Sequence, residues 1–243
     1  VLLPALVGCV SFRAAADSVG SLRPAFHEPP AAARPMMRWW LFGPAVLKEG
    51  IERELRLMRE GGIGGFEVQP VYPHSLDDAA RGIRNLRYLS DEFLEALRFT
   101  AEKARELDLR FDLTLGTGWP YGGHTVPIEH AAARLRCDKV PVPAVPSRRV
   151  PLPDLGAGES FIAAFAMPAK VELIDIREGA LWLPEGGVRP EEIWYFVASR
   201  TGQQVKRAAF GAEGFVLDHY SRPALDHFLK TVGEPLLQAV GPN

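Results

Sequence analysis

Three short apolar segments alternate with two longer amphipathic ones in the first half of the chain, and this order limits the folds open to it. The apolar segments at 34–42, 64–72 and 109–116 have the length and composition of β-strands. The segments at 47–62 and 89–107 repeat apolar residues at helical spacing. Strand, helix, strand, helix, strand with short connections is typical of a parallel sheet of right-handed βαβ units. We therefore predict an α/β fold with the first three βα units of a (β/α)8 TIM-like barrel.

The sequence after residue 130 has a different texture. Prolines punctuate it, and short β-rich runs such as SFIAAFAM and EIWYFVAS follow with Gly or Pro turns between them. This pattern predicts an antiparallel, β-rich insertion after the third strand. A third helix is expected at 221–240, with Ser221 as its N-cap and Pro235 kinking it. Its apolar stripe is predicted to be Leu225, Phe228, Leu229 and Val232.

These patterns divide the chain into four parts. Residues 1–33 are expected to be a signal or leader and linker, 34–129 the first part of the barrel, 130–216 the insertion, and 217–243 the third barrel helix. The chain stops where a fourth strand would begin. Because a parallel sheet with an uncovered edge is an unusual end for a domain, we expect the chain to be a fragment of a longer protein.

The first residues resemble the end of a bacterial export signal. An apolar stretch is followed by small residues, and Ala14-Ala15-Ala16 fits an A-x-A cleavage site. Leu6-Val7-Gly8-Cys9 also resembles a lipobox, in which Cys9 would carry a lipid anchor. We therefore expect an exported protein that is periplasmic, secreted or an outer-membrane lipoprotein. The alternative is a plain alanine-rich tail.

Charge and hydropathy exclude several classes of partner. The formal net charge is −2, which gives no electrostatic reason to expect nucleic acid or an anionic membrane. No apolar run approaches 18 residues, so no transmembrane segment is predicted. Cys9 and Cys137 are the two cysteines, and removal or lipidation of Cys9 would leave no disulfide.

Polar residues alternate with apolar ones along the three predicted strands. In a barrel of this type the outward positions pack on helices, and chemistry occurs where the strands end. The inward positions and the loop after the third strand supply a carboxylate, amide, guanidinium and indole set suited to hydrogen-bonding and stacking on a sugar. The candidate substrate-binding residues are Arg38, Trp40, Glu67, Gln69, Asp112, Trp119, His124, Asp218 and His219.

Several of these residues also fit structural roles. Arg38 could form an ion pair with Glu67 or Asp112 inside the barrel, and Trp40 could belong to the core. Asp218 and His219 could form the turn that precedes the third helix. Glu67 is the strongest functional candidate, because a carboxylate near the end of a strand is costly without a partner or a task. The segment GTGWPYG is a poor dinucleotide site, since Tyr121 replaces the third glycine.

Three segments together resemble glycoside hydrolase family 106. They are RWWLFGPAVLKEGIERELRLMREGGIGGFEVQPVY, DLTLGTGWPYGG and GFVLDHYSRPALDHFL, within residues 34–126 and 214–240. The resemblance implies exported bacterial α-L-rhamnosidases with a TIM-like catalytic barrel. It also implies inversion, which needs two carboxyl groups roughly 6.5–9.5 Å apart, and a calcium ion held by oxygen ligands.

The same resemblance places the main acid/base pair beyond Asn243. We therefore expect this chain to carry part of a pocket for terminal α-L-rhamnose of plant polysaccharides or glycosides, and to be inactive alone. Two alternatives stay open at this point. One is a non-catalytic carbohydrate-binding or scaffold protein, and the other is a barrel glycosidase that acts on another sugar.

Overall fold

The computed structural model describes residues 19–42, 47–142, 147–186 and 189–241. The predicted lipobox with Cys9 and the cleavage site at Ala14-Ala15-Ala16 lie outside these residues. Within them, no helix is both long enough and apolar enough to cross a lipid bilayer.

The first half of the chain contains the predicted alternation of strands and helices. The helices are α1 (Val19–His27), α2 (Lys48–Glu60), α3 (Asp91–Glu106), α4 (Arg222–Phe228) and α5 (Glu234–Val240), with 3-10 turns at Ala31–Ala33, Ala79–Arg81 and Ile128–His130. The strands are β1 (Met36–Phe42), β2 (Gly65–Val71), β3 (Arg110–Leu113), β4 (Gly122–Gly123), β5 (Ala133–Pro141), β6 (Arg149–Pro151), β7 (Ser160–Met167), β8 (Val171–Glu172), β9 (Ile176–Arg177), β10 (Ala180–Trp182), β11 (Glu192–Arg200) and β12 (Phe215–Val216).

β1, β2 and β3 form a parallel sheet in that order. Arg38 is in register with Glu67, and Glu67 with Asp112, so these positions share one face of the sheet. The parallel α/β arrangement is as predicted. The described strands do not close into a barrel, and the TIM-like barrel therefore stays a prediction.

α2 and α3 cover the opposite face of the parallel sheet. Ile51 and Leu55 of α2 and Phe93 of α3 join Phe66 and Val68 of β2 in one buried cluster. These are the apolar stripes and outward strand positions that the sequence predicts. Ser90 caps α3 as expected, because its hydroxyl accepts a hydrogen bond from the Phe93 amide.

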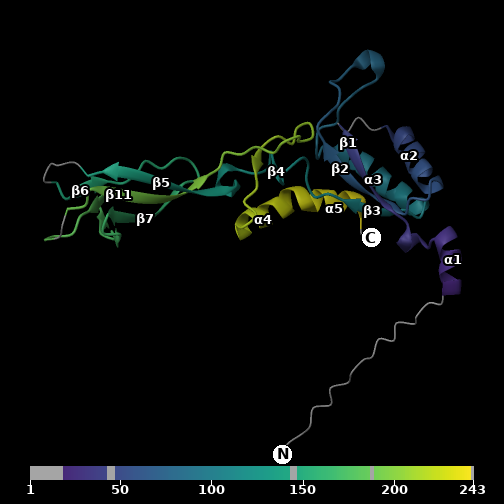
Figure 1. The fold of residues 1–243 in the computed structure, drawn as a ribbon. Helices are drawn as coiled ribbons and strands as arrows, with labels where there is room; N and C mark the ends of the chain where they lie inside the picture. The colour runs from purple at the N-terminus through teal and green to yellow at the C-terminus, as the bar shows by residue number, and fades with distance from the viewer. Residues whose placement is uncertain (1–18, 43–46, 143–146, 187–188, 242–243) are drawn as a thin grey trace, which may run out of the picture.

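The insertion is antiparallel, as predicted, and has its own core. Figure 1 shows β5, β7 and β11 extending away from the parallel sheet. They form a four-stranded sheet in the order β5-β11-β7-β8, and a smaller sheet has the order β6-β10-β9. A second buried cluster, which includes Leu181, Ile193 and Tyr195, lies in this part. Residues 205–217 instead pack with the first cluster, and the boundary predicted at 216 stays a prediction.

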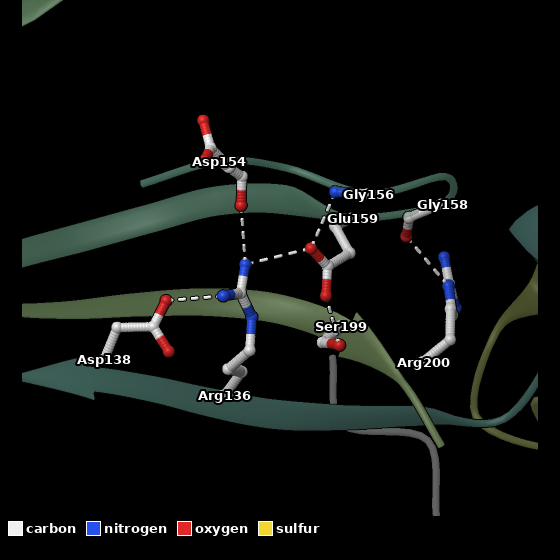
Figure 2. A network of polar contacts seen from close by, with 8 residues as sticks. All are labelled: Arg136, Asp138, Asp154, Gly156, Gly158, Glu159, Ser199 and Arg200. Carbon is white, nitrogen blue, oxygen red and sulfur yellow. Dashed lines mark hydrogen bonds and ion pairs between the residues drawn. The ribbon is translucent and has the colours of Figure 1, made fainter. Parts of the chain in front are cut away.

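A polar network joins the strands where the insertion meets the rest of the molecule (Figure 2). Glu159 accepts hydrogen bonds from the Ser199 hydroxyl, the Gly156 amide and the Arg136 guanidinium. Arg136 also pairs with Asp138. These contacts tie the loop at 154–159 to two strands of the larger sheet.

The third helix departs from prediction in its middle. Ser221 caps it as expected, accepting from the Ala224 amide. The five residues Leu229–Gly233 form a π-helical segment before Pro235 begins the next turn of α-helix. Each π turn contains an extra residue, which rotates later side chains around the axis. The predicted stripe is therefore wrong at Leu229, whose side chain is half exposed, while Phe228 and Val232 are buried.

Candidate functional site

The candidate site lies on the face of the parallel sheet that α2 and α3 leave uncovered. Successive residues of a strand point to opposite faces, so burial of Phe66 and Val68 against the helices turns Glu67 and Gln69 to the other side. Register adds Arg38 and Asp112 to the same face. Four predicted site residues are thereby brought together by backbone geometry.

Glu67 is held at both carboxylate oxygens. The Nε of Arg38 donates to Oε2 at 2.9 Å, and the hydroxyl of Thr114 donates to Oε1 at 2.6 Å. The Glu67 side chain keeps 30% of its surface exposed. The carboxylate is therefore a fixed, solvent-accessible acceptor, and the ion pair with Arg38 that the sequence left open is present.

A cavity of about 290 Å³ adjoins this pair. It is lined by Arg38, Glu67, Gln69, Thr114, Gly118, Trp119, Pro120 and Tyr121. A larger cavity of about 730 Å³ lies in the insertion, but it is lined mainly by apolar residues and includes none of the predicted site residues. The smaller cavity is the better candidate, because polar groups from β1, β2 and the loop after β3 converge on it.

Two tryptophans stand at the cavity. The rings of Trp40 and Trp119 are 5.7 Å apart and tilted by 64°. Their side chains are 39% and 37% exposed, so neither belongs to the core. Exposed indoles beside hydrogen-bonding groups suit the C–H face and the hydroxyls of a sugar ring.

The backbone of Trp119 is fixed by a distant segment. Its amide donates to the carbonyl of Lys206, and the Lys206 amide donates back to the carbonyl of Trp119. Gly118 sits directly before this contact with a positive φ of 60°, and a Cβ there would lie 2.3 Å from the Lys206 oxygen. The loop thus needs glycine at this position to approach residue 206.

Asp112 and His124 lie outside the cavity. Asp112 shares its face of the sheet with Glu67 but pairs with Arg110 at 3.0 Å. His124 is exposed, and partial burial followed by the neighbouring Arg87 lowers the pKa of its imidazole, which Glu213 partly offsets. The structure does not bring His124 to the other candidates.

Asp218 and His219 occupy the turn before α4. The Asp218 carboxylate accepts from the Tyr220 amide and lies 3.6 Å from the Arg200 guanidinium. His219 instead reaches the edge of the site, with its ring 6.3 Å from that of Tyr121. Tyr121 lines the cavity and is absent from the predicted residues, although its place on a glycine-rich loop was a signal that could have included it.

The described residues do not form a calcium site by themselves. Calcium takes six to eight oxygen ligands, and no group of three or more His, Cys, Asp or Glu side chains in the described ranges is arranged to hold a metal. Both oxygens of Glu67 are already engaged, and Asp112 pairs with Arg110. A calcium ion here would need further oxygen ligands.

Comparisons with known proteins agree with this location. The family model described as α-L-rhamnosidase, glycoside hydrolase family 106, matches residues 27–140. That range contains Arg38, Glu67, Trp119 and Tyr121. No match was found among the curated proteins.

A solved rhamnosidase from Novosphingobium sp. PP1Y has a similar fold. The two chains are 15% identical with a TM-score of 0.61, over 91% of this chain and 38% of the rhamnosidase. At that identity the likeness concerns the fold alone, and this chain spans well under half of the solved one. Through residues 27–140, which carry the cavity and both tryptophans, the chain belongs to glycoside hydrolase family 106.

Proposed function

We propose that the cavity binds a terminal α-L-rhamnosyl unit of a plant polysaccharide or glycoside. The observation that carries the proposal is the convergence of Trp40 and Trp119 with the Arg38–Glu67 pair, inside the family match. The indoles would stack on the sugar, and the guanidinium, carboxylate and amide would bond to its hydroxyls.

We propose that the protein to which this chain corresponds is an exported, inverting glycosidase built on a TIM-like barrel. An inverting pair needs roughly 6.5–9.5 Å between carboxyl groups. Glu67 and Asp112 are register partners on neighbouring strands, which lie about 4.8 Å apart, and each is paired with an arginine. The acid/base pair would therefore include groups outside the described residues, as would most ligands of a calcium ion.

The binding step can be tested with this chain. Titration with methyl α-L-rhamnoside, followed by tryptophan fluorescence and by NMR of the sugar, should give saturable binding that methyl α-D-glucoside does not reproduce. Trp119→Ala should weaken binding by roughly tenfold, because one stacking surface is lost. Unchanged affinity in Trp119→Ala with the fold intact would contradict the proposed platform.

The catalytic step has its own test. Hydrolysis of an aryl α-L-rhamnoside, with calcium present, should occur with a protein that carries a complete acid/base pair and should be absent from residues 1–243 alone. No turnover by such a protein would contradict the glycosidase proposal. The rival proposal, a non-catalytic carbohydrate-binding protein, is favoured by the arginine pairing of both nearby carboxylates, and it predicts binding without turnover in every case.

A further inference from the structure

An aromatic surface continues from the cavity toward solvent. Tyr121 lines the cavity and is 44% exposed, and its ring lies 6.3 Å from the ring of His219, which is also exposed. Together with Trp40 and Trp119 these side chains form a band of four rings. A single sugar between the two indoles would leave the outer half of this band uncovered.

The outer pair is held in position by contacts from both sides. The Tyr121 carbonyl accepts from the Leu217 amide at 2.9 Å, two residues before His219. The short β4–β12 ladder, with Gly122 opposite Val216, keeps the two segments side by side. The Tyr121 ring also rests on Gly116, where an added Cβ would lie 2.5 Å from the ring. Rings fixed before binding lose little conformational freedom when a ligand stacks on them.

We propose that Tyr121 and His219 bind the ring next to the terminal rhamnosyl unit, so that the site recognises a disaccharide or longer saccharide. The inference rests on the proposed function and extends it outward from the cavity. Each ring offers an apolar face, and the phenol and imidazole can also hydrogen-bond to hydroxyl groups. Sugar is therefore a better occupant of this position than a purely apolar group.

The test compares one ring with two. Methyl α-L-rhamnoside and a set of disaccharides with terminal α-1,2-, α-1,3-, α-1,4- and α-1,6-linked L-rhamnose are titrated into the chain. At least one disaccharide should bind roughly fivefold more tightly than the methyl glycoside, which is the gain expected from one further stacked ring. Tyr121→Ala and His219→Ala should remove this gain and leave the affinity for methyl α-L-rhamnoside unchanged.

Tyr220→Ala is the matched control. Tyr220 follows His219 and is fully exposed, so its loss should leave all affinities as they are in the parent chain. If the parent binds methyl α-L-rhamnoside but no disaccharide more tightly, the inference is wrong and the proposed function stands. Equal losses for both ligands in Tyr121→Ala would also overturn it. If the parent binds none of the sugars, the proposed function fails and the inference with it.

Discussion

At the scale of single residues, the hydroxyl of Thr114 tests how firmly Glu67 is held. Thr114 is buried, and its hydrogen bond goes to a carboxylate, a type of bond usually worth about 1.5–3 kcal/mol. Because Glu67 is partly exposed, we expect Thr114→Val to cost about 1 kcal/mol in the free energy of unfolding. Urea denaturation measures this value, and sugar affinity should fall as well because the carboxylate loses one of its two fixed contacts.

Thr125→Val is the control for that substitution. The Thr125 hydroxyl is buried and has no hydrogen-bond partner in the part of the chain that the structure describes. Replacing it by a methyl group should therefore leave stability unchanged or raise it. Equal losses of stability in the two variants would mean that the bond from Thr114 to Glu67 contributes nothing.

Residue-level prediction succeeded where a regular strand decides the direction of a side chain. The period of two along a strand placed Arg38, Glu67 and Gln69 on the open face of the sheet. It could not place Tyr121, because that side chain follows a loop whose course depends on contacts nearly a hundred residues away. His124 sits on the same loop and points elsewhere for the same reason.

At the scale of elements, the loop after β3 depends on its close approach to the segment at 204–217. Gly118 and Gly202 both have positive φ values, of 60° and 69°. A Cβ at Gly202 would meet nothing within 4 Å, whereas one at Gly118 would collide with the Lys206 carbonyl. Gly202→Ala should therefore cost about 1 kcal/mol from backbone strain alone.

Gly118→Ala should cost more than twice as much, since the strain adds to a backbone clash. The affinity for methyl α-L-rhamnoside should also fall in Gly118→Ala and be retained in Gly202→Ala, because Trp119 is anchored by the Lys206 contacts. Thermal unfolding and sugar titration of the two variants measure both effects. Similar losses in the two variants would show that the approach to Lys206 does not position Trp119.

The polar network at the base of the insertion should make this part sensitive to acid (Figure 2). Hydrogen bonds from Ser199 and then Gly156, together with Arg136, lower the pKa of the Glu159 carboxyl. A group with a lowered pKa in the folded state stabilises the protein at neutral pH, and that stability is lost as the pH falls. The loss should begin below about 4.3, the ordinary value for Glu, and continue down through the folded value.

Glu159→Gln should therefore lower the melting temperature at pH 7 and flatten its dependence on pH below about 4.3. Circular dichroism melts from pH 7 to pH 3 measure this difference. Glu172→Gln is the control, because Glu172 is exposed on the edge strand β8. An identical pH profile for Glu159→Gln and the parent chain would show that the network contributes no linkage.

Element-level prediction was limited by backbone irregularity. Helix starts at Ser90 and Ser221 were predictable because a hydroxyl cap is a local signal. The π-helical segment at Leu229–Gly233 has no such signal, since ordinary 3.6-residue periodicity assumes that no residue is inserted. Pro235 correctly marked the region as irregular but did not reveal the form of the irregularity.

At the scale of the whole molecule, two cores meet at a narrow junction. The α/β core includes residues from 41 to 126 and from 205 to 240, while the core of the insertion lies between 150 and 195. Alternating strands and helices predicted the first core, and turn-rich β-segments predicted the second. Barrel closure could not be tested by either pattern, because it depends on strands beyond the three that the sheet contains.

The junction between the cores suggests a deletion that removes the insertion and keeps the site. Ala133 and Arg200 are antiparallel register partners, so an Asn-Gly turn can replace residues 134–199 between them. The Arg200 contacts with Ala131 and Asp218 are retained in this variant. Since none of the cavity-lining residues belongs to the deleted part, the affinity for methyl α-L-rhamnoside should stay within about twofold of the parent chain.

Cooperative thermal unfolding of the deletion variant should persist, because the first buried cluster draws no member from residues 134–199. Adding Trp119→Ala to the deletion should weaken sugar binding by the same factor as in the full chain, which shows that the same pocket is measured. A folded deletion variant that no longer binds the sugar would mean that the insertion contributes to the site. A variant that fails to unfold cooperatively would mean that the α/β core needs the insertion to fold, which contradicts the independence of the two cores.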